Sequence, residues 1–349
     1  MAHRIVGLDV GAESIRAAQL LISARGEVVV EKVGEVPLPE SVIETGDVND
    51  QDGLAAVLAK FWVDLGFKTK RVVLGANSMH VFARELSVPV MSLQRIRESL
   101  QFLMEGVLPV SPDQLYLDFY PIERKTEESG PVYQGLAVAA DKNSVDMLVD
   151  AVTKAKLRPI GVDFIPFALL RVRNLAEFQA ETLALVDIGA GTTNVVIARG
   201  GVPLFVRIIP VGGNDLDREL MFQLKLDHDE AIVAKMGLSA DAKDKRSIDV
   251  KSVVDNQNME LVANLKNTFE YFGQARPADR ANISKVLLSG GGALTLGIAD
   301  AISSGLGVQV ELVNKLANIN KAETLHITDE RLSHMAMAIG LALGEVEHV

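Results

Sequence analysis

The sequence contains one pattern twice, and this internal repeat constrains the fold more than any other feature. Residues 5–20 (IVGLDVGAESIRAAQL) and 183–199 (LALVDIGAGTTNVVIAR) each have an apolar run ending in aspartate, a glycine-containing turn, and a second apolar run. Four residues of the first copy align with four of the second at a constant offset of 178, the difference between 187 and 9: Asp9, Gly11, Ala12 and Ser14 with Asp187, Gly189, Ala190 and Thr192. Because this offset is about half of the 349 residues, we expect two homologous lobes; the alternative is a chance similarity between two hairpins.

Each lobe is expected to begin as a three-stranded meander. Near-continuous apolar runs suit strands that are covered on both faces, and a glycine-containing turn precedes a third strand in both copies. The expected strands are 5–10, 15–22 and 27–33 in the first copy and 183–188, 193–198 and 203–209 in the second. Helical spacing follows at 53–65 in the first lobe, and at 215–226 and 229–236 in the second.

Residues of about 84–165 indicate a compact α/β insert. Apolar spacing predicts helices at 92–105 and 143–156 and strands at 114–123 and 132–140, and the polar stretch 125–131 predicts a surface turn between the strands.

Composition excludes several classes of protein. The absence of cysteine excludes disulfide frameworks, thiolate zinc sites and cysteine nucleophiles, and it fits a reducing compartment. A net charge of −11 disfavours nucleic acid and anionic lipid as partners. No stretch reaches the roughly 18 uninterrupted apolar residues of a membrane span, and the first residues do not form a signal peptide. We therefore expect a cytoplasmic protein with no nucleic-acid partner and no direct membrane insertion.

The repeated turns are suited to phosphate and its metal. Glycine lets the turn backbone approach a ligand closely, successive N–H groups form an anion-binding nest, and an aspartate at the strand end can hold hydrated magnesium. A third glycine cluster, Gly290, Gly291, Gly292 and Ala293, follows a strand and precedes an expected helix at 294–303. Its amides and the helix dipole would favour an anion or a flat ring, although neither a P-loop nor a dinucleotide fingerprint is present.

These motifs resemble those of the actin-like ATPase superfamily. The two Asp-Gly turns, the glycine cluster and the small-residue helix 334–342 are similar to its phosphate 1, phosphate 2, adenosine and connecting motifs, in the same order. The insert resembles the extra subdomain of the branch that contains FtsA and PilM, and segments 161–168, 186–194 and 211–214 are most similar to the PilM-type family. The resemblance extends from residue 4 to about 344.

The resemblance implies a two-lobed α/β actin-like fold with an FtsA/PilM-type inserted subdomain. Residues 1–83 would form the N-terminal part of the first lobe, 84–165 the insert, and 166–349 the second lobe, whose C-terminal helix returns to the first. ATP or ADP would bind between the lobes, with Asp9 and Asp187 holding Mg2+ mostly through water. The implied nucleotide-binding residues are Asp9, Gly11, Ala12, Glu13, Ser14, Arg16, Asp187, Gly189, Ala190, Gly191, Thr192, Thr193, Asn194, Gly213, Asn214, Lys235, Gly290, Gly291, Gly292 and Ala293.

Three departures from the family pattern bear on activity. Arg16 stands where PilM-like chains usually carry lysine, Ile165 where a glutamate is common, and Ile232 where an acidic partner of Lys235 is expected. An aliphatic side chain can neither orient nor deprotonate the attacking water. Asp163 is the remaining candidate for a catalytic residue, with a capping role as the alternative. Slow hydrolysis, or none, is therefore expected.

The implied function is that of an ATP-binding scaffold of a type IV pilus machine. The N-terminal cytoplasmic peptide of a PilN-like inner-membrane protein would lie in a groove beside the insert and recruit the chain to the inner face of the membrane. Other pilus assembly components and self-association are further expected partners. An FtsA-like division protein would carry a basic amphipathic C-terminal anchor, whereas residues 344–349 are acidic. A small-molecule kinase would need a carboxylate base, and the sequence indicates none.

Overall fold

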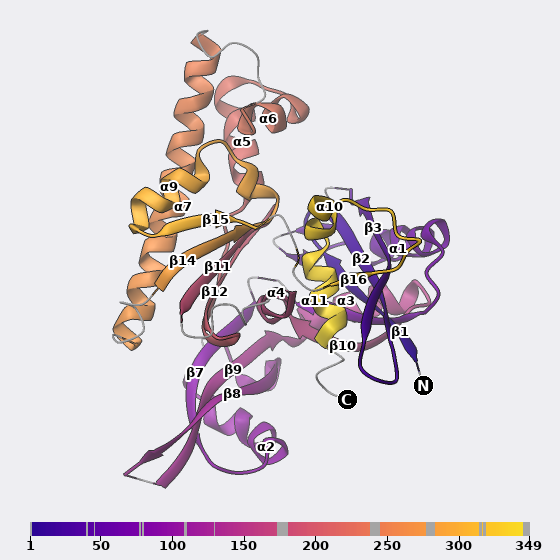
Figure 1. The fold of residues 1–349 in the computed structure, drawn as a ribbon, viewed down its shortest axis with the longest axis vertical. Helices are drawn as coiled ribbons and strands as arrows, with labels where there is room; N and C mark the ends of the chain where they lie inside the picture. Colours follow the sequence, from indigo (N-terminus) through magenta and orange to yellow (C-terminus); the bar gives the residue numbers. More distant parts are fainter. Residues whose placement is uncertain are drawn as a thin grey trace. The chain divides into compact units, whose positions relative to one another are not determined.

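The computed structural model describes residues 2–344 except 40, 45, 77, 79, 108–109, 129, 173–180, 238–244, 277–282, 314–315 and 317–318. The chain divides into two compact units (Figure 1). The first unit comprises Met1–Leu175, Gly201–Ile208 and Lys315–Val349. The second comprises Ala176–Gly200 and Ile209–Asn314.

A six-stranded sheet forms the centre of the first unit. Its order is β10 (Arg158–Phe164), β6 (Arg71–Ala76), β1 (His3–Val10), β2 (Ser14–Ile22), β3 (Val28–Pro37) and β16 (Asn320–Lys321). Strands β1, β2 and β3 form the expected antiparallel meander, and β6 joins β1 in parallel. A two-residue hairpin, β4 (Ile43–Glu44) and β5 (Asp47–Val48), precedes helix α1 (Gln51–Leu65).

Two helices cover this sheet with one apolar core. Helix α1 begins at the N-cap Asp50, whose carboxylate accepts a hydrogen bond from the Gly53 amide, and it ends at the left-handed Gly66. Helix α3 (Lys142–Lys154) packs against α1 in the same cluster. The cluster includes Val6, Leu8, Leu54, Leu58, Trp62, Leu148 and Val152.

The C-terminal helix α11 (Ala336–Gly344) packs against β1 and against α4 (Ile165–Val172). It follows the short α10 (Asp329–His334). Glycines allow unusually close contact here, because a Cβ on Gly7 would overlap the Ala338 carbonyl oxygen and one on Gly340 would overlap that of Ala168. Among the described residues, no helix combines the length and apolar character needed to cross a membrane.

A separate antiparallel sheet of three strands belongs to the first unit. Its order is β7 (Val81–Pro89), β9 (Gly130–Asp141) and β8 (Leu115–Glu127), and it packs on α2 (Leu93–Leu103). A 3-10 turn, η1 (Pro112–Gln114), leads into β8. The core is built by Val88, Ile96, Leu100, Met104, Leu115 and Phe119. The strands are longer than expected, so residues 125–127 and 131, predicted in the turn, are paired within β8 and β9.

Two elements within the residues assigned to the insert, the expected helix α3 and the unpredicted strand β10, pack elsewhere in the first unit. Helix α3 shares the core of α1, because its buried residues Leu148, Ala151 and Val152 face that cluster. Strand β10 pairs in parallel with β6 and extends the six-stranded sheet. The boundaries predicted at 84 and 165 remain predictions.

The second unit contains the second copy of the repeat. Strands β11 (Thr182–Ile188) and β12 (Thr193–Arg199) are antiparallel, and β14 (Ile283–Ser289) and β15 (Gln309–Leu312) follow β11 in parallel. Strand β13 (Val202–Ile209) forms where the third strand was expected, after Gly200 and Gly201, which both have positive φ, but its residues 202–208 belong to the first unit. Helices α5 (Gly213–Leu224), α6 (His228–Lys235) and α7 (Lys245–Ala275) share one core, and α7 also contacts α9 (Ile298–Leu306).

Candidate functional site

The two repeated turns are closed by the same backbone hydrogen bond. In the first turn the Gly11 amide donates to the Ser14 carbonyl over 2.9 Å, and in the second the Gly189 amide donates to the Thr192 carbonyl over 2.8 Å. The aspartates occupy equal register positions, since Asp9 pairs with Arg16 and Asp187 pairs with Asn194. The alignment made from sequence therefore extends to backbone geometry.

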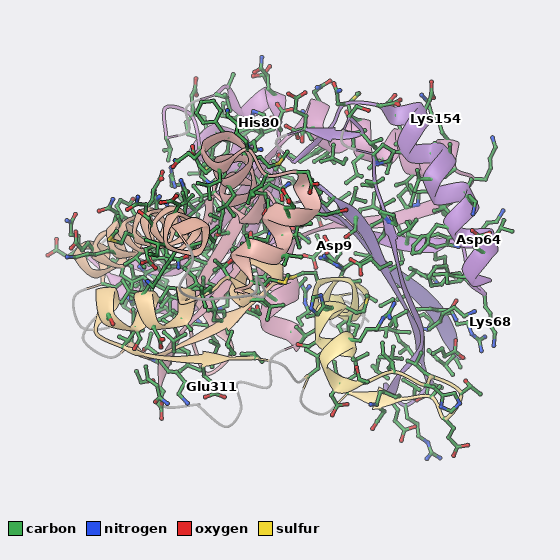
Figure 2. All side chains as sticks on the ribbon, turned by 90° about the horizontal axis from the view of Figure 1, so that it is seen from above. Asp9, Asp64, Lys68, His80, Lys154 and Glu311 are labelled. Carbon is green, nitrogen blue, oxygen red and sulfur yellow. The ribbon has the colours of Figure 1, made fainter. Side chains whose placement is uncertain are left out.

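Asp9 lies at the end of β1 and is 6% exposed. In Figure 2 it lies away from the rim of the molecule that carries Asp64, Lys68 and Lys154. The neighbouring Glu13 carbonyl accepts a hydrogen bond from the Leu38 amide over 2.8 Å, which ties the turn to the end of β3. Because both sides of the turn are fixed in this way, its amides have a defined direction.

A charged row crosses the first sheet beside this turn. Arg16 stands opposite Asp9 on one side and opposite Glu35 on the other. The Arg16 guanidinium lies 3.7 Å from the Asp9 carboxylate through Nη1 and 2.9 Å from Glu35 through Nε. Burial by itself would raise the pKa of Glu35, but Arg16 and a hydrogen bond from Ser14 outweigh burial and hold that pKa below its ordinary value.

Residues 211–214 close over the second turn. The Gly213 amide donates to the Gly189 carbonyl and the Asn214 amide to the Ala190 carbonyl, both over 2.9 Å. A Cβ on Gly212 would overlap the Ala190 carbonyl oxygen, so only glycine permits this approach. The first turn of α5 is thereby placed directly against the repeated turn.

The third glycine cluster packs against the end of β11. Gly290 has φ +90°, and a Cβ there would overlap the Ile188 carbonyl oxygen. The Ser289 hydroxyl donates to the Asp187 carboxylate over 2.8 Å. The predicted start of the helix at 294–303 is wrong. Gly291–Leu294 forms a 3-10 turn, and α9 begins only at Ile298, because Gly297 adopts the left-handed conformation.

Lys235 is held next to the second turn. Its ammonium forms an ion pair with Asp217 of α5, and the two side chains are only 12% and 4% exposed. The Lys235 Nζ atom lies 3.4 Å from the position of a Cβ on Gly213. The second unit therefore brings together the predicted residues of the second turn, Gly213, Asn214, Lys235 and the glycine cluster.

Sequence reasoning missed Glu35 and Asp217. Glu35 depends on the pairing of β2 with β3, which no motif reveals. Asp217 carried a weak signal, because it stands between Leu216 and Leu220 on an apolar helix face where an acid is unusual.

Three polar oxygens in this region receive no hydrogen bond from the residues that the structure describes. They are Asn194 Oδ1, Asn214 Oδ1 and Asp217 Oδ1, each in a side chain at or next to the second turn. Buried acceptors of this kind normally have partners. Hydroxyl groups or water introduced with a ligand would supply the missing donors.

Asp163, the predicted catalytic candidate, lies in the first unit together with Ile165, and Ile232 lies on α6. The Asp163 carboxylate forms an ion pair with Arg171 and accepts a hydrogen bond from the Phe164 amide over 2.8 Å. Ile165 is 1% exposed and packs against Gly75. Ile232 is half-buried on α6.

A magnesium ion would need phosphate oxygens among its ligands. Within the described ranges, no group of three His, Asp or Glu side chains is placed to hold a metal ion. Magnesium in nucleotide sites usually combines one or two carboxylates, phosphate oxygens and several waters. Asp9 in the first unit and Asp187 in the second are each a carboxylate at the end of a strand, of the kind that such a donor set uses.

A groove of about 450 Å3 lies in the first unit between the two sheets. Its walls are residues 116–118 of β8, residues 145, 146 and 149 of α3, and residues 162–164 of β10; we call it the β8–β10 groove. The Tyr116 hydroxyl donates to Asp146 over 2.9 Å, and this hydrogen bond raises the pKa of Tyr116. Arg97 pairs with Asp118.

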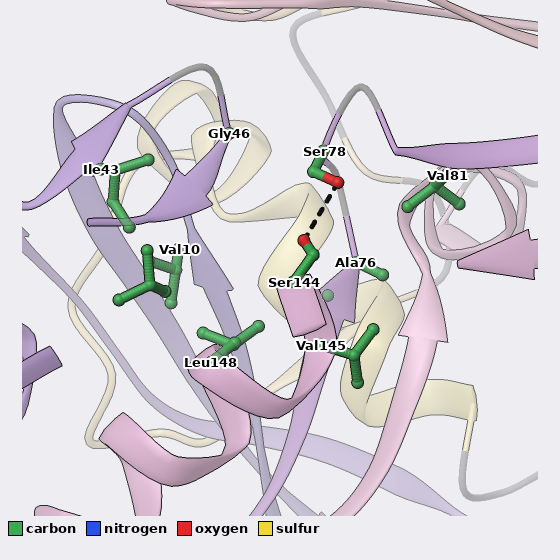
Figure 3. Close-up of a pocket in the computed structure, with 11 residues that line it drawn as sticks. Val10, Ile43, Gly46, Ala76, Ser78, Val81, Ser144, Val145 and Leu148 are labelled. Atoms are coloured by element: carbon green, nitrogen blue, oxygen red, sulfur yellow. Dashed lines mark hydrogen bonds between the residues drawn. The ribbon is translucent and has the colours of Figure 1, made fainter. Parts of the chain in front are cut away.

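A second, much smaller pocket lies at the start of α3 (Figure 3). Its volume of about 20 Å3 is room for little more than one water molecule. The hydroxyls of Ser78 and Ser144 lie 3.2 Å apart beside it, and the Ser144 hydroxyl also donates to Asp47. These contacts fix the start of α3 to the segments around it.

Comparison with known proteins gives a consistent result. The family model described as type IV pilus assembly protein PilM matches residues 7–346. A structure described as a PilM-PilN type IV pilus biogenesis complex is 25% identical, with a TM-score of 0.85 and 98% of each chain covered. MreB5 of Spiroplasma citri, solved with ADP, is 13% identical, with a TM-score of 0.58 and coverage of 99% and 97%.

A curated relative lies in the same superfamily branch. Cell division protein FtsA of Bacillus subtilis (strain 168) is 20% identical over 271 residues, which cover 70% of this chain. The chain spans 60% of the length of that relative. Together the structural matches confirm the predicted α/β actin-like fold.

Proposed function

Because the chain belongs to the PilM family of type IV pilus assembly proteins, we propose that it binds ATP or ADP with Mg2+ and docks the N-terminal cytoplasmic peptide of a PilN-like membrane protein. The observation that carries the nucleotide proposal is the repeated turn with one hydrogen-bond geometry in both units. The docking proposal rests on the β8–β10 groove.

Each turn offers a short row of amides to phosphate. In the first unit these belong to residues 11–14, and in the second to residues 189–192, with Gly213 and Asn214 alongside. Such a nest of N–H groups favours anions. Magnesium, when bound, neutralises phosphate charge, and Asp9 and Asp187 would hold it mostly through water. MreB5 structures solved with ADP and with AMPPNP support nucleotide binding by this fold.

Hydrolysis is proposed to be slow. The base that would orient water is replaced by the buried Ile165, and Asp163 is engaged by Arg171. The Asp163 carboxylate is thus held by the Arg171 guanidinium and by the Phe164 amide, and it is not placed to orient a water molecule. The chain would then use the nucleotide mainly as a bound ligand that stabilises its folded state.

The β8–β10 groove suits an extended peptide. In the described part of the chain, β8 and β10 each pair on one side only, so each leaves backbone groups for another strand. An added strand gains main-chain hydrogen bonds, and side-chain pockets supply specificity. Val162 and Tyr116 are 39% and 47% exposed and offer apolar contact. Asp146 would favour a basic residue of the peptide.

The matched PilM-PilN structure supports this partner. A net charge of −11 gives the chain little attraction to anionic lipid, so a membrane protein's tail is the more plausible means of recruitment. We propose that this recruitment places the chain at the cytoplasmic face of the membrane, where other pilus components and further copies of the chain would join it.

The nucleotide proposal is tested by thermal unfolding. We expect the melting temperature to rise with ATP or ADP plus magnesium, and the Asp187→Asn variant to lose most of this rise. Asp300→Asn removes an exposed carboxylate of the same unit and should behave like the parent. No rise in the parent with either nucleotide would refute nucleotide binding.

A further inference from the structure

Glu35 of β3 occupies the polar groups of the first turn. Its Oε1 atom accepts a hydrogen bond from the Ser14 hydroxyl over 2.8 Å and another from Arg16 Nε over 2.9 Å. Arg16 stands directly opposite Glu35, whereas Ser14 lies two residues earlier on β2, opposite Pro37. The strand register thus places both donors beside Glu35. Glu35 therefore holds two donors of this turn through one oxygen atom.

The family resemblance assigns Ser14 and Arg16 to the nucleotide site, and the proposed function places the Ser14 amide among those that face phosphate. Ser14 and Arg16 belong to the predicted nucleotide-binding set of the first unit. Carboxylate and phosphate oxygens are acceptors of the same kind, and both form strong charge-assisted hydrogen bonds with guanidinium groups. A phosphate that uses Ser14 and Arg16 must either displace Glu35 from them or share them with it.

The pair can be reached from solvent. The side chains of Arg16 and Glu35 are 31% and 32% exposed, whereas that of Asp9 is 9% exposed. A ligand could therefore contact Arg16 and Glu35 without prior opening of the core. An anion that binds there would face Glu35 across water and not across the protein interior. Glu35 could therefore release Ser14 and Arg16 to the anion.

The second turn lacks the corresponding charge. The residue aligned with Arg16 is Asn194, which stands opposite Asp187, is 2% exposed and carries no charge. Its amide oxygen receives no hydrogen bond from the described residues. The repeat has thus diverged: the first copy holds a charged network and the second a neutral, buried amide.

We propose that Glu35 is an internal anion that competes with nucleotide phosphate for Ser14 and Arg16, and that it thereby lowers the affinity of the first turn for nucleotide. This inference rests on the proposed nucleotide binding. It assigns Glu35 the role of an affinity-determining residue. Its removal should strengthen nucleotide binding, whereas removal of a residue that merely positions Arg16 would weaken it.

The test compares Glu35→Gln with the parent by titration calorimetry of the full chain with ATP and magnesium. Glutamine keeps the shape and an acceptor oxygen but loses the charge. We expect roughly twofold to fivefold tighter ATP binding, the range for loss of a partly exposed charge interaction. A smaller gain is expected for ADP and none for adenosine, because the competing charge acts on phosphate.

Glu31→Gln is the matched control. Glu31 lies on the same strand, at a distance from the turn, and accepts two hydrogen bonds from Arg4. The Glu31→Gln variant therefore loses a comparable ion pair with arginine that does not involve the turn. The ATP affinity of the Glu31→Gln variant should equal that of the parent. In the double variant Glu35→Gln/Arg16→Gln, the gain should disappear, because Arg16 is the group released to phosphate.

The outcomes separate the two hypotheses. Unchanged or weaker ATP binding by a folded Glu35→Gln variant, in a parent that binds ATP, would overturn the competition but leave nucleotide binding intact. An equal gain for adenosine would also overturn it, because the effect would then not involve phosphate. Absence of ATP binding by both the parent and Glu35→Gln would overturn both proposals.

Discussion

Lys235 and Asp217 form an ion pair that is buried beside the second repeated turn, with both side chains less than one-eighth exposed. Sequence comparison placed the acidic partner of Lys235 at position 232, where the chain has isoleucine. The structure supplies that partner from α5 instead of α6. The charge balance at this point of the second unit is therefore kept by a different residue.

Asp217→Ala should strongly destabilise the fold, because it leaves the Lys235 ammonium buried without its anion. The expected cost is about 3–5 kcal/mol of the free energy of unfolding, measured by urea denaturation. Asp255→Ala, which breaks the exposed Lys251–Asp255 pair of α7, should cost at most about 1 kcal/mol. The double variant Asp217→Leu/Lys235→Met should regain stability but not the nucleotide-induced rise in melting temperature. Equal costs for the two aspartate variants would contradict this assignment.

Asp146→Asn should weaken binding of a peptide from the cytoplasmic tail of the partner membrane protein by roughly threefold to tenfold, because the β8–β10 groove loses an anion that faces a basic residue. Fluorescence anisotropy with a labelled peptide measures the change. Asp150→Asn removes the same charge from an exposed position of α3 outside the groove, and it should bind like the parent. Replacement of the peptide's basic residues by glutamine should abolish the difference between Asp146→Asn and the parent; if the difference persists, the charge contact is wrong.

Turnover of ATP should stay far below the median enzyme rate of about 10 per second, because no carboxylate replaces Ile165. Release of inorganic phosphate from a purified sample, followed over hours, measures it. Asp163→Asn should leave this slow rate unchanged, since the Asp163 carboxylate forms an ion pair with Arg171 in the structure. A parent rate near 10 per second, or a sharp loss in Asp163→Asn, would show that the chain is an active hydrolase.

Stability should fall in acid partly through Glu31. Its hydrogen bonds from Arg4 lower the pKa below the ordinary value of 4.5, in spite of the opposing effect of burial. A carboxylate whose pKa is lowered by folding stabilises the native state above its unfolded pKa, and this contribution is lost as pH falls through the folded pKa. The difference in unfolding free energy between the parent and Glu31→Gln should thus be full at pH 7 and shrink below about pH 4.5. A difference that is constant with pH would contradict the ion pair.

The sequence predicted features that depend on neighbouring residues more reliably than features that depend on packing. Both repeated turns formed as expected, because a strand, a glycine turn and a second strand are encoded within about 20 residues. The insert's helix 92–105 also formed, as Leu93–Leu103. The start of α9 was missed because Gly297 adopts a left-handed conformation that the apolar spacing does not encode.

The remaining differences arise from contacts between distant segments. Helix α3 was predicted, but its packing on α1 depends on a partner about 90 residues earlier in the chain. Glu35 and Asp217 escaped notice for the same reason, since strand register and helix packing bring them to Arg16 and Lys235.

The contact of α11 with β1 has a consequence for synthesis of the protein. A strand from the first residues of the chain is covered by a helix at 336–344, and Gly7 admits the Ala338 carbonyl so closely that no other segment of different shape could replace it. During translation this apolar face of β1 stays uncovered until the helix has left the ribosome. Contacts of such large sequence separation form late and slowly, so the first unit completes its core only after residues 336–344 have been synthesised.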